Sequence, residues 1–234
     1  MSLGPDVTKR NELMCTWSGL VFVLLFALGW VVIGGFVPPP SPAADAAQIV
    51  AFYQTHTPIV RLGLLLTQAS CIFFLPWVAV ISVQMKRLEA PGTVLATTQL
   101  ISGAVALLII LLPTMIWGVA SFRPERNPEL TLLLNDLAWL IFTMTFAPFV
   151  MQAVAIGWAI LGDPRTQPLF PRWVAYFNFW TALSFVPAGL IIFFKSGPFA
   201  WNGVIGFWLP VSVFFVWFIV MLVFMVKAIR REGD

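Results

Sequence analysis

The stretch "VIGFWLPVSVFFVWFIVMLVFMV", residues 204–226, contains no charged side chain. A helix of roughly 20 apolar residues crosses the hydrocarbon core of a bilayer, so this stretch is long enough to span a membrane. Backbone groups in lipid must be hydrogen-bonded within their own segment, and a barrel strand would alternate apolar with polar residues. The stretch is continuously apolar instead. It therefore predicts a transmembrane helix.

The rest of the chain repeats this pattern. Of 234 residues, 60% are hydrophobic and 10% are charged, whereas soluble domains carry about 25% charged residues. We predict an all-α fold: a polytopic membrane helix bundle of six transmembrane helices, forming a single integral membrane domain over residues 1–234. The predicted spans are about Met14–Val37, Ile59–Val83, Val94–Ala120, Leu130–Leu161, Trp173–Phe194 and Val204–Val226.

The basic residues predict the orientation of this bundle. With the N-terminus inside, nine of the 13 Lys and Arg residues lie on the inner side, and cytoplasmic loops carry the excess of such residues. Both termini are therefore predicted to be cytoplasmic. The inner cations are expected to set the topology and to contact anionic lipid headgroups. They form no basic patch that would bind nucleic acid.

The longest loop is predicted to lie outside, between the first two spans. It begins with a proline run, and Ser41 followed by Pro42 resembles an N-cap and first helical residue. From residue 43 to residue 53, apolar residues recur at helical spacing, with Ile49, Val50 and Tyr53 on one face. We expect a short amphipathic outer helix at about 43–53, acting as a lid over the bundle or as a gate over a lipid-facing cavity.

Internal prolines occur in every span except the first. Each removes a backbone hydrogen bond and is expected to bend its helix. These bends either only shape the bundle or splay it enough to leave a cavity lined by the abundant Phe and Trp. The prolines are Pro76, Pro113, Pro148, Pro187 and Pro210.

An aspartate interrupts the apolar segment "LTLLLNDLAWLIF", residues 130–142. Asp136 lies ten residues from the middle of its span, so it is about 15 Å from the membrane centre, at the edge of the hydrocarbon. Arg61 is at a similar depth, and Lys195 ends the fifth span. We predict that Asp136 is ionised and paired, with Arg61 as first partner and Lys195 as second, in either a structural or a functional role.

Two helical stripes suggest a candidate ligand site at this outer level. Asp136, Trp139 and Thr143 share one face of the fourth span, and Arg61 and Gln68 share a face of the second. A crevice between them would have a charged mouth and an apolar, aromatic floor, which suits an amphiphile. The predicted ligand-binding residues are Arg61, Gln68, Asp136, Trp139, Thr143 and Lys195.

Signatures of common enzyme classes are missing from the sequence. It has no Walker loop, Gly-rich dinucleotide turn, metal-ligand set or nucleophile elbow. We therefore expect no metal and no cofactor, and no catalytic residue is assigned unless Asp136 acts as a general acid.

Several stretches resemble small bacterial six-span membrane proteins of uncharacterised function. These stretches are "FVPPPSPAADAAQIV", "FRPERNPELTLLLNDLAW", "FPRWVAYFNFW" and "FFKSGPFAWNG". The resemblance implies a multi-pass protein of the bacterial cytoplasmic membrane, and it carries no activity.

Three functions remain open on this evidence. The first is a non-enzymatic protein that binds a lipophilic small molecule or membrane lipid, or serves as an accessory subunit among other membrane subunits. The second is an acid-assisted isomerase or cyclase acting on a terpenoid or steroid-like lipid, with Asp136 as proton donor. The third is a small transporter or channel, which the lack of visible inverted repeats and of midplane charges disfavours.

Overall fold

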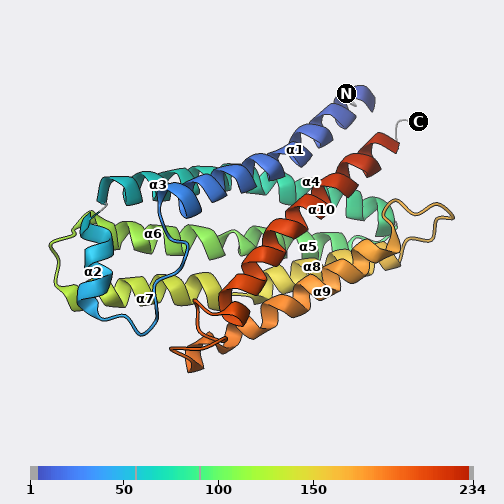
Figure 1. Cartoon of the computed structure of the whole chain (residues 1–234). Coiled ribbons are helices and arrows are strands. Elements are labelled where there is room, and N and C mark those ends of the chain that lie inside the picture. The colour runs from blue at the N-terminus through green and yellow to red at the C-terminus, as the bar shows by residue number, and fades with distance from the viewer. Residues whose placement is uncertain (1–4, 56, 90, 232–234) are drawn as a thin grey trace.

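A computed structural model describes residues 5–55, 57–89 and 91–231, and all of its regular structure is helical. Six helical stretches are long and apolar enough to cross a membrane, which confirms the predicted six-span bundle. The fold is drawn in Figure 1. The spans are Asp6–Ile33, Thr57–Glu89, Val94–Phe122, Pro128–Leu161, Arg172–Phe193 and Val204–Arg231.

Each of the six spans consists of more than one helical segment. The first and last join an α-helix to a π-helical segment, the second contains a short 3-10 turn, and the fifth ends in a 3-10 helix. The third and fourth are each divided into two α-helices. In chain order the spans are α1 (Pro5–Phe26) with η1 (Ala27–Ile33), α3 (Thr57–Ser70) with η2 (Cys71–Phe73) and α4 (Phe74–Glu89), α5 (Val94–Ala106) with α6 (Leu108–Phe122), α7 (Pro128–Met144) with α8 (Ala147–Leu161), α9 (Arg172–Phe185) with η3 (Val186–Phe193), and η4 (Val204–Trp208) with α10 (Leu209–Arg231).

The prolines explain where most of these segments begin. Pro76, Pro148, Pro187 and Pro210 each lie in the first turn of a new segment, and a proline cannot donate the backbone hydrogen bond that would continue the preceding segment. Pro113 alone among the five lies inside a helix, α6. The prolines therefore mostly mark the point where a span changes from one helical segment to the next.

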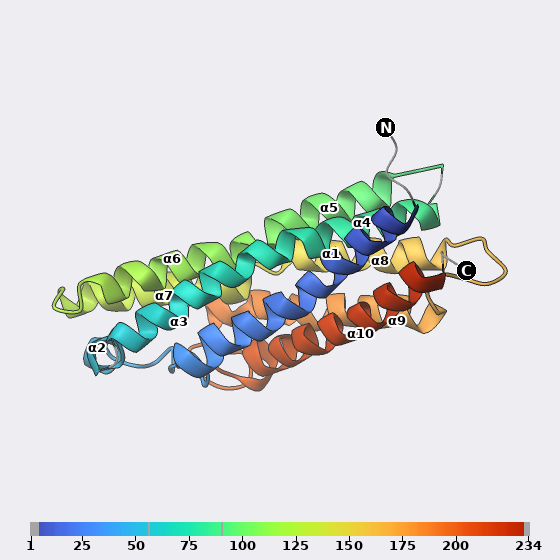
Figure 2. The ribbon, with the colours of Figure 1, turned by 90° about the horizontal axis from the view of Figure 1, so that it is seen from above.

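Both chain ends lie at one end of the bundle, and α2 (Ala46–Thr55) crosses the opposite end (Figures 1 and 2). Lys9 Nζ donates to the carbonyl oxygen of Arg230 at 3.2 Å, which links the first and last helices. We call these the terminal end and the α2 end. The termini are thus on one side, as predicted, and the assignment of that side to the cytoplasm remains a prediction.

The short helix predicted between the first two spans forms as α2, with the predicted buried face of Ile49, Val50 and Tyr53. Its start differs from the prediction. Asp45 Oδ1 accepts from the backbone N–H of Gln48 at 2.8 Å, and Gln48 Oε1 accepts from that of Asp45 at 3.1 Å. This reciprocal capping box starts the helix after Asp45, whereas the Ser41 hydroxyl accepts from the N–H of Ala43 in the preceding turn.

Glycines allow the first two spans to approach closely near the α2 end. A Cβ added at Gly63 of α3 would clash with the backbone of Gly34, and one added at Gly29 would lie 2.8 Å from the carbonyl oxygen of Gly63. Small residues at such crossings let membrane helices pack in van der Waals contact. The contact holds η1 against α3 and thereby places Trp30 inside the bundle, where it is 1% exposed.

Candidate functional site

A cavity of about 80 Å³ lies where the interruptions of the six spans meet. Every span contributes wall residues within a few positions of its own interruption. Irregular backbone at membrane depth is tolerated where it is buried in protein or lines a cavity. The six interruptions therefore share one site. Representative wall residues are Trp30 (η1), Phe74 (α4), Ile110 (α6), Phe146 (between α7 and α8), Phe185 (α9) and Phe207 (η4).

The wall of this cavity is apolar and largely aromatic. The polar side chains that reach it are Thr143, Thr145 and the indole of Trp30, and none of its lining residues is ionisable. Thr143 Oγ1 donates to the carbonyl oxygen of Trp139 at 2.8 Å, so its proton is already used. The cavity can hold hydrocarbon, and it offers no acid or base for proton transfer.

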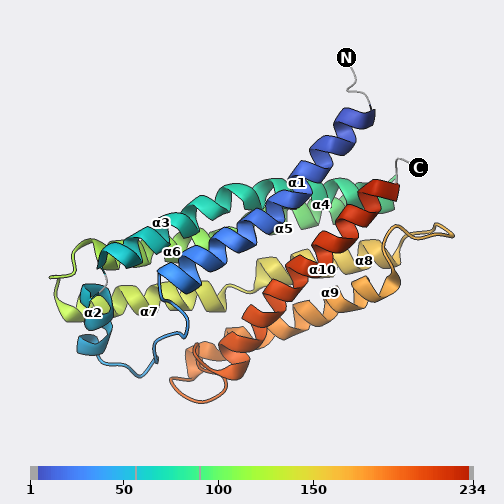
Figure 3. The same cartoon turned by 45° about the horizontal axis from the view of Figure 1, so that its top comes forward.

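The cavity reaches the surface of the bundle beside the interruption of the fourth span. Thr145 is exposed, and Phe146 and Phe215 are partly exposed. Figure 3 shows the non-helical connection between α7 and α8 at this place. A lipophilic molecule could therefore enter from the membrane without passing through water.

The predicted ion pair between Arg61 and Asp136 is not formed. Arg61 Nη2 donates to the backbone oxygens of Ser121 at 2.7 Å and Phe122 at 2.9 Å. These carbonyls belong to the last turn of α6, where backbone oxygens lack helical partners and the helix dipole attracts a cation. The prediction was wrong because α6 is the helix beside α3, and its C-terminus takes the guanidinium.

Asp136 makes no ion pair with any residue that the structure describes. Lys195, the second predicted partner, follows η3 and is exposed, and it acts on the Asp136 carboxylate only at longer range. Asp136 itself is partly exposed and does not line the cavity. Because Asp136 is not among the lining residues, the geometry does not support it as a proton donor to a molecule bound in the cavity.

The two predicted stripes lie in different places. Arg61 and Gln68 line a shallow groove between α3 and α6, where Gln68 Nε2 donates to the carbonyl oxygen of Leu111 at 3.1 Å. Thr143 lines the aromatic cavity, and Trp139 is buried one turn closer to the α2 end. The structure therefore replaces the single predicted crevice with a lipid-facing groove and a separate interior cavity.

Helix α2 is fastened over the α2 end by a buried hydrogen bond. Tyr53 Oη donates to Asn135 Oδ1 of α7 at 3.1 Å, and both residues are almost fully buried. Burial raises the pKa of Tyr53 well above its usual value, and the nearby Asp136 carboxylate raises it further. The phenol therefore stays protonated and continues to donate.

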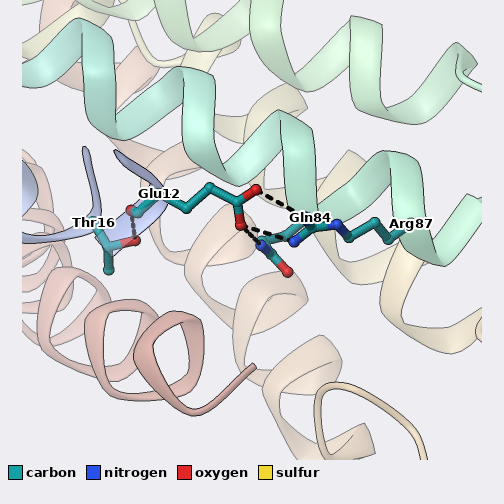
Figure 4. A network of polar contacts seen from close by, with 4 residues as sticks. All are labelled: Glu12, Thr16, Gln84 and Arg87. Atoms are coloured by element: carbon teal, nitrogen blue, oxygen red, sulfur yellow. Dashed lines mark hydrogen bonds and ion pairs between the residues drawn. The ribbon is translucent and has the colours of Figure 1, made fainter. Parts of the chain in front are cut away.

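A second polar cluster, at the terminal end, was not predicted (Figure 4). Arg87 donates to both carboxylate oxygens of Glu12, at 2.8 and 2.7 Å, and Gln84 Nε2 donates to Glu12 Oε2 at 2.9 Å. The sequence signal was the spacing of Gln84 and Arg87, which puts both on one face of α4. Since both residues that donate hydrogen bonds to Glu12 belong to α4, the cluster joins α1 to α4.

No group of three or more His, Cys, Asp and Glu side chains that could hold a metal ion occurs among residues 5–55, 57–89 and 91–231. Comparison with models of known families, with curated proteins and with solved structures finds no match. The resemblance to bacterial six-span proteins is thus supported in its architecture alone: the chain is a multi-pass membrane protein with six membrane-spanning helices.

Proposed function

We propose that this protein is a non-enzymatic membrane protein that binds a lipophilic molecule in the aromatic cavity. The observation that carries the proposal is that all six spans change from one helical segment to another around a single apolar cavity, which opens beside the break between α7 and α8. Binding sites in helical bundles are mostly apolar pockets with few polar groups. The cavity favours lipophile binding over the accessory-subunit alternative, and the position of Asp136 outside it disfavours the acid-assisted enzyme.

A small transporter is the second candidate. Discontinuous helices around a site within the membrane are a recurring feature of secondary transporters, and the fourth span is broken between α7 and α8 beside the cavity. An apolar cavity would select an apolar cargo rather than an ion. Flux of a lipophilic cargo across liposomes that contain the protein would favour transport, whereas binding without flux would favour the first proposal.

The proposed binding is tested by filling the cavity. Ala106 lines it and is 5% exposed, while Ala104, two residues earlier in α5, faces outward. Ala106→Leu adds three carbons to the cavity, and Ala104→Leu adds the same atoms to the lipid-facing surface. We expect a lipophile to copurify from native membranes with the wild type and with Ala104→Leu, and to be lost from Ala106→Leu.

Thermal unfolding of the same samples separates loss of binding from loss of fold. Cavity-filling substitutions commonly leave stability unchanged or raise it by about 1 kcal/mol, so Ala106→Leu should unfold no earlier than the ligand-free wild type. Equal amounts of lipophile on all three proteins, or none on the wild type, would contradict the proposal.

A further inference from the structure

Three buried tryptophans separate the cavity from the α2 end. Trp30 of η1, Trp117 of α6 and Trp139 of α7 have ring centroids 6.2 Å (30–117), 5.9 Å (30–139) and 5.1 Å (117–139) apart. We call them the tryptophan cluster. Each is at most 1% exposed, and Trp30 also lines the cavity. Trp30 therefore belongs to the cavity wall, and Trp117 and Trp139 lie behind it.

The indole N–H groups of all three have no hydrogen-bond partner among the described residues. Two other tryptophans have acceptors: Trp217 Nε1 donates to Asn178 Oδ1 at 2.8 Å, and Trp201 Nε1 donates to the carbonyl oxygen of Pro40 at 2.9 Å. Trp77 Nε1 also lacks a partner among the described residues, but Trp77 does not line the cavity and stands outside the cluster. A buried donor without an acceptor costs about 1–3 kcal/mol. Three such donors in contact indicate a position where an acceptor is supplied from outside the chain.

Contacts between the rings do not account for all three donors. Trp117 and Trp139 meet edge to face, with an interplanar angle of 66°, and this geometry can direct one N–H at the neighbouring ring. Such a contact is weaker than a hydrogen bond to oxygen. Trp30 meets the other two at tilted angles of 33° and 54°. At least the donor of Trp30, a residue that lines the cavity, remains without an acceptor among the described residues.

The chemistry of these groups restricts the head of the ligand. An indole N–H donates a hydrogen bond and cannot accept one, so the ligand must contain the acceptor atom. None of the residues that line the cavity or form the cluster is charged, and an anion desolvated there would have no cation to offset its cost. A neutral oxygen acceptor fits this environment.

Building on the proposed function, we propose that the lipophile carries a carbonyl group, and that Trp30, supported by Trp117 and Trp139, donates a hydrogen bond to its oxygen. The carbonyl end of the molecule occupies the cavity of about 80 Å³, and the rest of its apolar chain extends through the opening beside Thr145. The ligand class is thus a carbonyl-bearing lipophile, such as a long-chain ketone or ester, rather than a plain hydrocarbon or an anionic lipid.

Two matched probes test this inference on the full chain in detergent. 2-Octanone and 2-methyl-1-octene have the same carbon skeleton around the double bond and differ by an oxygen in place of a CH₂ group. Affinity is measured by titration, and the indole N–H groups are followed by NMR of protein with labelled tryptophan. We expect the ketone to bind about tenfold more tightly, as one added hydrogen bond would give, and to shift the Trp30 signal downfield.

Substitutions then assign the effect to the cluster. Trp30→Phe should reduce the affinity for the ketone to that for the alkene, while Trp180→Phe, on a side chain that is 48% exposed on α9, should leave the difference intact. Ala106→Leu should abolish binding of both probes. If Trp30→Phe fails to fold, the NMR shift in the wild type decides by itself.

The outcomes separate the two proposals. Equal affinity for both probes, with loss of both in Ala106→Leu, would overturn the carbonyl inference and leave lipophile binding in the cavity standing. Binding of neither probe to the wild type would overturn both. A ketone preference that survives Trp30→Phe would also overturn the role given to the cluster.

Discussion

The Tyr53 hydroxyl in α2 donates to the Asn135 side-chain oxygen in α7 at 3.1 Å, and Tyr53 is 0% exposed. This bond connects the short outer helix directly to a membrane-spanning helix. It gives the amphipathic segment between the first two spans a fixed place on the bundle, since Ile49 and Val50 alone would provide only non-directional apolar contact.

Removing this bond should loosen the outer helix. Tyr53→Phe leaves the Asn135 oxygen buried without its donor, which costs about 1–3 kcal/mol. We expect a lower unfolding temperature in detergent and faster proteolysis within residues 46–55. Tyr176→Phe, at a position that is 59% exposed, is the matched control and should change neither. Equal stability of the two variants would show that the bond does not hold α2.

Alkaline pH should weaken the same contact. The pKa of Tyr53 is raised in the folded protein by burial and by Asp136, whereas an unfolded tyrosine ionises near about pH 10. The contribution of the buried phenol is therefore complete below about pH 10, and it is lost as pH rises above that value, because the unfolded chain gains by ionising. The free energy of unfolding should fall more steeply above pH 10 in the wild type than in Tyr53→Phe. Parallel curves would contradict this prediction.

The cluster at the terminal end should behave as one coupled unit. The Glu12 side chain is 10% exposed and receives two hydrogen bonds from Arg87, so removing either partner strands a largely buried polar group. We expect Glu12→Gln and Arg87→Met each to destabilise the bundle by about 2 kcal/mol. The double variant should cost less than the sum of the two. Strict additivity in a thermal or denaturant titration would show that the pair is not coupled.

Arg61 and Asp136 should be independent of each other. Arg61 caps α6, and Asp136 has no ion pair in the described part of the chain, so losses from Arg61→Leu and Asp136→Asn should add within about 0.5 kcal/mol. Arg61→Lys should recover little of the loss, because a single ammonium cannot reproduce the forked contact with two carbonyls. A loss of stability in the double variant that is clearly smaller than the sum of the two single losses would support the ion pair predicted from the sequence.

Close packing of the first two spans should make Gly63 intolerant of substitution. A Cβ there meets the Gly34 backbone, whereas one at Gly118 of α6 meets nothing within 4 Å. Gly63→Ala should destabilise the bundle by about 1–3 kcal/mol through overpacking. Gly118→Ala should be neutral or stabilising by up to about 1 kcal/mol, since alanine favours the helix. Thermal unfolding of the two variants, measured side by side, checks both expectations. Similar unfolding temperatures would contradict the close packing of the first two spans at Gly63.

The sequence by itself determined the features that depend on local composition and periodicity. Continuous apolar runs predicted the six spans, because a segment such as residues 204–226 must satisfy its backbone internally in lipid. Helical spacing of Ile49, Val50 and Tyr53 predicted the outer helix. The start of that helix was missed, although Asp45 and Gln48 have the spacing of a capping box.

The tertiary structure decided which helices are neighbours, and with that the site. Depth alone made Asp136 a plausible partner for Arg61, but α6 lies beside α3 and its terminal carbonyls take the guanidinium. The prolines left open a cavity lined by Phe and Trp, but only the tertiary structure decided that segments of all six spans surround one cavity and that Trp30, Trp117 and Trp139 meet beside it. Lipid tails are as apolar as the helices, so hydrophobicity does not select helix partners. That choice rests on close packing at residues such as Gly63 and on interhelical hydrogen bonds, which a single chain read in order does not reveal.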